Sequence, residues 1–299
     1  MSAAAAQFPA ASEGLGTKRR IVSYLGWGLC GLAFVLLGGA MVWILTIVFL
    51  RGAGALKLSV LTQITQGVGG GLLNAIEGSL LLAAGGILLA APLGLAAGIF
   101  LSEYETSPAA GPIRFLVDVL VGVPSIVIGY FGYVTMVAGL GWQFSIAAGS
   151  IALAIIALPY ICRTSEMAIR QVPRSIREAA YALGSTESRV ALGICVPAAL
   201  PGILTGILLA LAIAIGETAP LIYTAGWNNY LWTGHLTKEP VGYLTYAIWA
   251  FITEPFASAH ALAYAAAFLV TAFVLIISIV SRGLLDENAG WRRRRLRSR

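Results

Sequence analysis

Six long apolar stretches divide this chain and leave it few ways to fold. A helix needs about 20 apolar residues to cross roughly 30 Å of hydrocarbon at about 1.5 Å rise per residue. The stretches that meet this length cover residues 25–48, 79–101, 115–137, 143–164, 202–224 and 260–282. Because lipid offers no hydrogen bonds to the backbone, we expect an all-α, polytopic membrane protein with six transmembrane helices.

The composition agrees with this fold class. Apolar residues make up 59% of the chain and charged residues 11%, against roughly 25% charged residues in soluble proteins, which excludes a water-soluble protein. The 35 glycines predict helices that pack closely through small residues. The net charge of +6 follows from basic residues in the tails and one loop, so it predicts no nucleic-acid partner.

The basic residues also orient the spans. Three lie in the N-terminal tail, Arg114 in a short loop, five in the loop 163–200 and seven in the C-terminal tail, sixteen in all. The opposite side holds only Arg51, Lys57 and Lys238. Since the side richer in Lys and Arg stays cytoplasmic, we expect a plasma-membrane protein with both termini in the cytoplasm.

The ends of the chain complete this organisation. We expect a cytoplasmic tail at 1–24, a transmembrane anchor at 25–48, the main transmembrane domain at 76–282 and a basic cytoplasmic tail at 283–299. The first apolar stretch is too long for a signal peptide and lacks a cleavage site, so it should remain as an anchor. The C-terminal Arg292–Arg295, Arg297 and Arg299 suit contact with anionic lipids, with a cytoplasmic protein as the alternative.

Two external segments are too long to be simple turns. Gly69–Gly71, followed by Asn74 as a helix cap, predicts a flexible loop in 51–78, with a backbone anion cradle as the weaker alternative. The aromatic residues of 225–259 predict an interfacial belt with a short helix lying on the membrane. Two cysteines, Cys30 and Cys162, lie in spans and Cys195 lies in a loop, so we expect no disulfide framework.

The loop 163–200 contains a bounded helix. Pro173 suits a first helical turn and Gly184 the position after a helix end. One small apolar face follows from Ile176, Ala179, Ala180 and Leu183 at i, i+3, i+4 and i+7. Ser185 should cap a second helix whose first turn contains Glu187.

Three interpretations of this helix compete. It could pack on its own protein, or it could be a DNA-binding helix-turn-helix, although short tethers to two spans keep it from a major groove. The third interpretation is a docking helix, whose small apolar face and flanking arginines fit a groove in a cytoplasmic partner.

At this point the chain resembles a known family. Its Glu178-Ala179-Ala180, Gly184, Ile194 and Val196-Pro197, at their spacing, are similar to the EAA loop of permease subunits of ATP-binding-cassette importers. The resemblance implies a type I ABC importer permease fold in which the loop 173–197 docks on an ATPase subunit. The residues implied in this coupling are Glu178, Ala179, Ala180, Leu183, Gly184, Ile194 and Pro197.

The chain has no phosphate-binding Walker loop of its own. Such a loop needs Gly-Lys-Ser or Gly-Lys-Thr, and the three lysines, Lys18, Lys57 and Lys238, stand in other contexts. We therefore expect no catalytic, cofactor-binding or metal-binding residues, and ATP hydrolysis by a separate subunit.

The block Gly216-Glu217-Thr218-Ala219-Pro220-Leu221 places a carboxylate inside an apolar span. A charge at this depth costs at least about 2.5 kcal/mol, so Glu217 should face the bundle interior, a partner or a water-filled path. A structural glutamate, protonated or hydrogen-bonded within the bundle, is the alternative to a residue of the transport path.

This block, with Gly122-Val123-Pro124-Ser125-Ile126-Val127, resembles the second of the two paired permeases of phosphate-specific importers. The resemblance implies a translocation path that includes Ser125, Glu217, Thr218 and Pro220. It also implies a second homologous permease, two ATPase subunits and an extracytoplasmic phosphate-binding protein as partners. Those permeases often carry an Arg four residues before the glutamate, where this chain has Ile213.

Two other functions stay open. A permease for another oxyanion, such as molybdate or sulfate, would share the coupling loop. A carrier or channel that works alone would more often display several intramembrane ionisable groups or an internal repeat.

Overall fold

A computed structural model describes residues 13–297, with side chains for residues 16–283. Helices account for most of it, so the all-α prediction is confirmed. The elements are α1 Glu13–Ala55, α2 Leu58–Thr62, β1 Thr65–Gln66, β2 Gly69–Gly70, α3 Leu73–Glu103, α4 Ala110–Gly122, α5 Ser125–Gly132, the π-helix η1 Tyr133–Gly139, α6 Ile146–Arg170, α7 Arg174–Ala182, α8 Glu187–Val190, the π-helix η2 Ala191–Cys195, α9 Val196–Gly216, α10 Ala219–Thr224, α11 Leu244–Phe251 and α12 Ala257–Arg297.

Several of these helices are long and apolar enough to cross a membrane. Five straight candidates lie within the described residues, at Gly16–Ala55, Leu73–Glu103, Ile146–Arg170, Glu187–Gly216 and Ala257–Gly283. A sixth results if the bent pair of α4 with α5 and η1 is counted as one span. The chain is therefore a multi-pass membrane protein, and most spans are longer than expected.

The chain divides into two units, residues 1–50 and 51–299. The described part of the first unit is most of α1, whose apolar side chains between Ile21 and Leu50 are largely exposed. A helix that is apolar on every side needs lipid or protein around it. This segment therefore has the character of the expected anchor.

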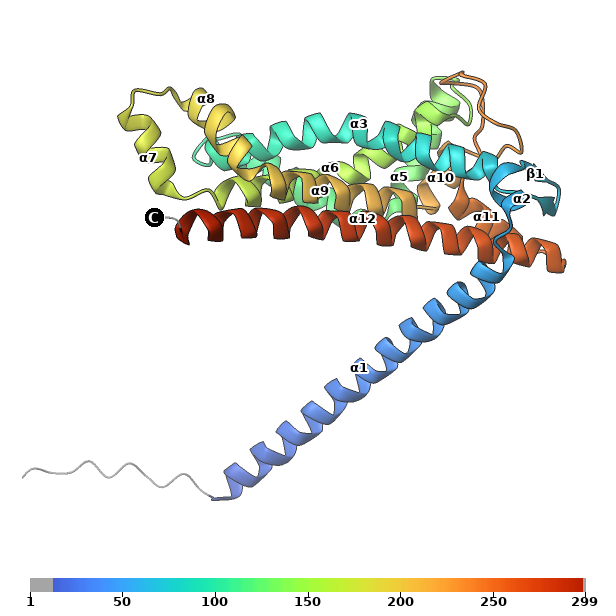
Figure 1. The fold of residues 1–299 in the computed structure, drawn as a ribbon, viewed down its shortest axis with the longest axis horizontal. Coiled ribbons are helices and arrows are strands. Elements are labelled where there is room, and N and C mark those ends of the chain that lie inside the picture. Colours follow the sequence, from blue (N-terminus) through green and yellow to red (C-terminus); the bar gives the residue numbers. More distant parts are fainter. Residues whose placement is uncertain (1–12, 298–299) are drawn as a thin grey trace, which may run out of the picture. The chain divides into compact units, whose positions relative to one another are not determined.

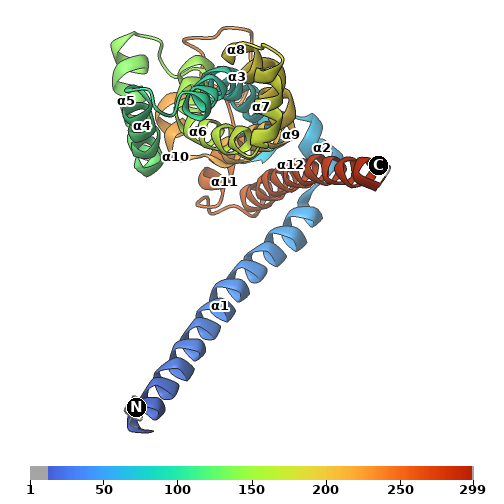
Figure 2. The ribbon, with the colours of Figure 1, turned by 90° about the vertical axis from the view of Figure 1, so that its left-hand side faces the viewer.

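In the second unit, α3, α6, α9 and α12 run alongside one another (Figures 1 and 2). Glycines let α3 lie very close to α6. A Cβ atom added to Gly94 would lie 2.9 Å from Ile161 Cβ, and one added to Gly98 would lie 2.7 Å from Ser165 Cβ. Side chains at these positions would force the helices apart, so packing through small residues is confirmed.

Different elements gather at the two ends of this bundle. Figure 1 shows α7 and α8 at one end and α2, β1 and α11 at the other. The strands β1 and β2 form a small antiparallel hairpin in which Thr65 faces Gly70. The predicted flexible run at Gly69–Gly71 is therefore wrong, because these glycines belong to or follow the hairpin.

Asn74 ties this hairpin down. Leu72, not Asn74, precedes α3 as its N-cap, so the predicted capping role is also wrong. The buried Asn74 side chain accepts hydrogen bonds from Thr65 N and Oγ1, both at 3.0 Å, and donates to the Asn228 carbonyl at 2.8 Å. The two long segments 51–78 and 225–259 are thus joined through one buried amide.

The segment 225–259 packs into the fold. Its expected short helix exists as α11, but Tyr243 and Phe251 are buried, and Trp227 stacks on Tyr246 with ring centroids 4.9 Å apart. Only part of the aromatic set, including Trp249, stays exposed as an interfacial belt would require. Burial of large aromatic surfaces favours packing over a position flat on the membrane.

The third predicted span is interrupted. The chain bends by 99° between α4 and the helix formed by α5 and η1. Pro124 lacks an amide hydrogen and disfavours helical geometry at Val123, which is extended with φ −75° and ψ 124°. A single straight helix over 115–137 is therefore wrong, and the bend has a local cause.

The cysteines need one correction. Cys195 lies buried in η2, within the continuous helix Glu187–Gly216, and not in a loop. The other two cysteines, buried Cys162 and exposed Cys30, are free thiols as well. At the C-terminus, Arg299 lies outside the described residues, as do the side chains of Arg292–Arg295 and Arg297.

Candidate translocation and coupling sites

The predicted translocation residues lie at a break between two helices. The expected continuous span over 202–224 is wrong, because the helix begins at Glu187 and ends at Gly216. Glu217 is extended, with φ −70° and ψ 137°. In a continuous helix the Pro220 ring would clash with the Gly216 carbonyl, whereas in the first turn of α10 its missing amide hydrogen costs nothing.

Glu217 is half-buried at this break and is contacted from two other elements. The hydroxyl of Ser125, the first residue of α5, lies close to its carboxyl. Its backbone carbonyl accepts a hydrogen bond from Thr245 Oγ1 on α11 at 2.7 Å. Within residues 16–283 no Lys or Arg forms an ion pair with this carboxyl.

Close packing of α5 on α10 brings Ser125 to this place. A Cβ atom on Gly129 would lie 2.5 Å from Pro220 Cα, so only glycine allows the two backbones to touch. Thr218 opens α10 through its carbonyl, which accepts from the amides of Leu221 and Ile222 at 3.2 Å. The four predicted residues, Ser125, Glu217, Thr218 and Pro220, are therefore neighbours in the structure.

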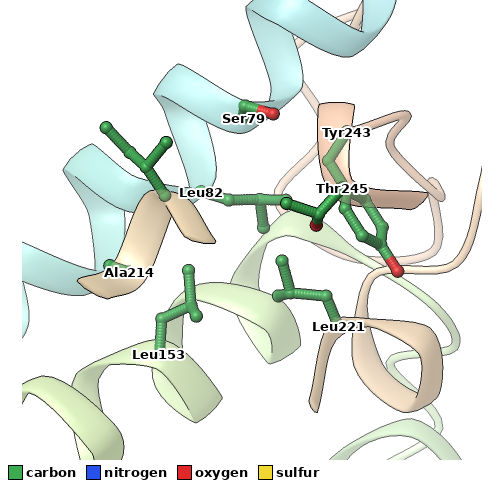
Figure 3. A pocket seen from close by; sticks show the side chains of 8 residues that line it. Ser79, Leu82, Leu153, Ala214, Leu221, Tyr243 and Thr245 are labelled. Carbon is green, nitrogen blue, oxygen red and sulfur yellow. The ribbon is translucent and has the colours of Figure 1, made fainter. Parts of the chain in front are cut away.

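A small pocket adjoins the break and is lined by residues before and after it (Figure 3). Its lining comes from α3, α6, α9, α10 and the start of α11: Ser79, Leu82, Leu153, Ala214, Ile215, Leu221, Tyr243 and Thr245. The space suits about one water molecule, which is too little for a phosphate ion. The hydroxyls of Ser79 and Thr245 are engaged, the first by the Leu244 amide at 2.8 Å and the second by Glu217.

The predicted docking helix is α7, and its bounds agree with expectation. Pro173 is its N-cap, and Gly184 has φ +75°, the left-handed conformation that glycine adopts most readily. Ser185 does not cap the next helix; Thr186 precedes α8 and makes no side-chain capping bond. The glycine corner between two helices is thus present with a different cap.

The predicted apolar face of α7 is divided. Ala180 is buried in a cluster with Val172 and Val190, whereas Ile176 and Ala179 are exposed. Leu183, just after the helix, is 87% exposed. Of this face only Ala180 therefore packs on its own chain, and Ile176, Ala179 and Leu183 present apolar atoms to solvent or to a partner.

The remaining coupling residues lie in two places. Glu178 is exposed on α7, next to Ala179. Ile194 lies in η2, half-buried against the same cluster as Ala180, and Pro197 is exposed in the first turn of α9. Glu178, Ala179, Leu183 and Gly184 thus share the exposed region around α7, while Ile194 and Pro197 belong to the helix that returns to the bundle.

A network of ion pairs beside α7 was missed in the sequence. The Glu166 carboxylate on α6 is 6% exposed and contacts three guanidinium groups, those of Arg114, Arg163 and Arg170, at 2.8, 3.1 and 3.2 Å. Asp118 on α4 pairs with Arg163, and Glu105 pairs with Arg170 at 3.3 Å. Only Glu166 is buried in this network, and replacing it would leave three guanidinium groups without their shared partner.

The signal for this network was available. Glu166 stands three residues after Arg163 and four before Arg170, the spacings at which side chains meet on one helix face. In the sequence these arginines indicate topology. A carboxylate at the edge of an apolar span also indicates a cationic partner.

Comparisons with known proteins point in one direction. Residues 90–287 match the family described as "Binding-protein-dependent transport system inner membrane component". The chain is 45% identical over 279 residues to the phosphate transport system permease protein PstA 2 of Mycobacterium bovis, covering 92% of this chain and 93% of that protein. It is 43% identical over 246 residues to the phosphate transport system permease protein PstA of Yersinia pestis, covering 81% and 82%.

A solved structure supports the fold. The MetNI methionine ABC transporter, in an inward-facing conformation, has a chain that superposes with a TM-score of 0.58 at 17% sequence identity. The match covers 71% of this chain and 95% of that chain. The predicted importer permease fold is therefore confirmed for most of the sequence.

Proposed function

Because this chain belongs to the family of binding-protein-dependent transport system inner membrane components, we propose that it is the pore-forming permease subunit that moves inorganic phosphate across the cytoplasmic membrane. The observation that carries this proposal is the 45% identity to a phosphate transport permease over 92% of the chain. The helix break at Glu217 supports it, since interrupted helices supply polar backbone for an ion path.

The proposed complex contains partners for energy and for substrate capture. Two ATPase subunits hydrolyse ATP, and α7 docks on one of them. This chain uses no cofactor, metal or catalytic residue of its own. A second homologous permease completes the pore, and an extracytoplasmic binding protein delivers phosphate. Both termini and α7 face the cytoplasm, as the distribution of basic residues predicts.

Transport in this proposal is alternating access at the break between α9 and α10. Closure of the ATPase pair moves α7, and the helices above it change the packing of α5 on α10. Ser125 and Glu217 then separate or approach, which opens or closes the path. The cation that phosphate requires comes from the second permease, or its place is taken by backbone amides, because Ile213 and Glu217 supply none.

Uptake by the purified complex tests the proposal. Proteoliposomes containing this chain, the second permease and the ATPase should accumulate labelled phosphate when the loaded binding protein and ATP are supplied. Uptake of sulfate or molybdate with their own binding proteins, without uptake of phosphate, would show that the substrate is another oxyanion. Phosphate uptake without the ATPase would instead indicate a carrier or channel that works alone.

A further inference from the structure

Arg177 ties the coupling helix α7 to two spans. Its Nη1 atom donates to both carboxylate oxygens of Glu103, at 2.7 and 2.6 Å, and its Nη2 donates to the Ile169 carbonyl at 2.9 Å. Glu103 is the last residue of α3, and Ile169 lies in the last turn of α6. A single side chain therefore holds α7 to the ends of both helices.

This contact is shielded from solvent. The Arg177 side chain is 19% exposed and that of Glu103 is 9% exposed. Burial alone would lower the pKa of Arg177, but the hydrogen bond and charge of Glu103 outweigh it and raise the pKa. The guanidinium therefore stays charged and paired, with little screening by salt.

Few other contacts restrain α7. Ala180 is the one buried residue of this helix, all of which is described, and an alanine methyl group contributes little burial. Arg174, Ser175, Glu178 and Ala179 are exposed. The orientation of α7 relative to the bundle therefore depends strongly on the bonds of Arg177.

The other end of α3 lies beside the helix break. Figure 1 shows α3 running from the end with α7 to the end with α2 and β1. On α3, Ser79 accepts from the Leu244 amide, and the next residue, Thr245, donates to the Glu217 carbonyl. Figure 3 shows Ser79 and Thr245 on the same small pocket. One rigid helix thus connects the Arg177 contact with the backbone of the break.

We propose that Arg177 and Glu103 are positioning residues that make α7 and α3 move as one body. The inference rests on the proposed function, in which the ATPase moves α7. When the pair is intact, a displacement of α7 pulls on α3 and reaches the backbone of Glu217. When the pair is broken, α7 still docks on the ATPase but moves against a bundle that does not follow.

The test compares paired variants in proteoliposomes that hold the complete complex. Glu103→Gln and Arg177→Gln remove the charge pair, and Glu105→Gln is the matched control, because Glu105 is 60% exposed and pairs with Arg170 on the same rim. Phosphate uptake and ATP hydrolysis are measured together and expressed per assembled complex. A role confined to stability would change the amount of complex and leave the ratio of ATP to phosphate unchanged.

The expected result is a change in that ratio. Glu103→Gln and Arg177→Gln should each raise the ATP hydrolysed per phosphate by at least about fivefold, the lower end of typical coupling between sites. The double variant should be no worse than either single variant, since both remove the same contact. Arg177→Lys should recover part of the ratio, and Glu105→Gln should keep the wild-type value.

A spin label at Leu183→Cys, just beyond α7, gives a readout that does not depend on transport. The label should become more mobile in Glu103→Gln and stay unchanged in Glu105→Gln. A wild-type ratio in both Gln variants, or unchanged label mobility, would overturn the proposal.

A failure of the proposed function would be seen separately. If the wild-type complex moves no phosphate but hydrolyses ATP on addition of loaded binding protein, phosphate is rejected as the transported substrate. The pair is then judged on that stimulation and on the label: loss of the stimulation with a more mobile label in Glu103→Gln supports positioning, and wild-type stimulation or unchanged label mobility refutes it.

Discussion

Glu217 is the residue whose chemistry most needs explaining, because a bare carboxylate on a phosphate path would repel the anion. Among residues 16–283 its carboxyl finds the Ser125 hydroxyl and no cation. We expect it to hold a cationic side chain of the second permease. Glu217→Gln should then leave assembly intact and lose most phosphate uptake, because the partner's cation stays unpaired in a low-dielectric site.

Two other roles for Glu217 predict different results in the same uptake assay. A protonated glutamate, or one that accepts a hydrogen bond from protonated phosphate, tolerates the nearly isosteric glutamine. Near-normal uptake by Glu217→Gln would therefore reject charge pairing. Loss of the assembled complex would indicate a structural glutamate.

Gly184 makes a second, independent test of a single residue. Its φ of +75° is strained for side chains, although no atom lies within 4 Å of an added Cβ, so the conformation and not the space is limiting. Gly184→Val should misplace α7 at a cost of about 1–2 kcal/mol. We expect normal membrane insertion, no phosphate uptake, and a rate of ATP hydrolysis that does not increase when loaded binding protein is added.

Asparagine supplies the control at this position, because it adopts the left-handed conformation more readily than valine. Gly184→Asn should retain most uptake. If valine were tolerated as well as asparagine, the backbone conformation at Gly184 would not matter for coupling.

Single residues were predictable where a motif or a glycine conformation defined them. The bounds of α7 followed from Pro173 and Gly184, and two residues that the resemblance implies in the path, Ser125 and Glu217, lie close together. Two partners of Glu166, Arg163 and Arg170, stand at helical spacing on its own helix, so the sequence contains a signal for that network. The ion pair of Glu103 could not be predicted, because its partner Arg177 comes from another element and no local spacing names it. Asn74 was misjudged for the same reason, since its partner Asn228 is 154 residues away.

The contact between α5 and α10 can be tested as a contact between elements. Gly129→Ala places a methyl group 2.5 Å from Pro220 Cα, and backbone cannot move aside as a flexible side chain would. We expect α5 to shift, Ser125 to leave Glu217, and uptake to fall about tenfold or more, with an overpacking cost of about 1–3 kcal/mol. Gly122→Ala is the control, because nothing lies within 4 Å of its added Cβ.

Uptake is again the measurement, normalised to assembled complex. Equal activity in the two alanine variants would show that close packing of α5 on α10 does not matter for transport. A loss in Gly122→Ala alone would place the sensitive point in α4.

The elements themselves were predicted by hydropathy and broken by proline. Apolar length located a helix for every predicted span, but the fifth helix runs over Glu187–Gly216 and not over 202–224, and Pro124 and Pro220 do not lie within straight helices as predicted. Both mark real interruptions: Pro124 directly precedes Ser125, and Pro220 follows Glu217 by three residues. A proline within about one turn of a polar residue in an apolar span is therefore better interpreted as a break that exposes backbone for function.

Orientation in the membrane is a property of the complete chain, and it rests on sixteen basic residues against three. The fold tells where to place the labels, because α7 lies at one end of the second unit and α2 lies at the other (Figure 1). Lys57, Ser175 and Lys238 are all exposed, so a cysteine at any of them is accessible to reagents on its own side.

In a variant with Cys30, Cys162 and Cys195 replaced, an impermeant maleimide added to intact cells should label positions 57 and 238 and spare 175. Permeabilised cells should show labelling at all three, which controls for reactivity. Labelling of 175 from outside, with 57 and 238 protected, would reverse the orientation and place α7 where no ATPase could reach it.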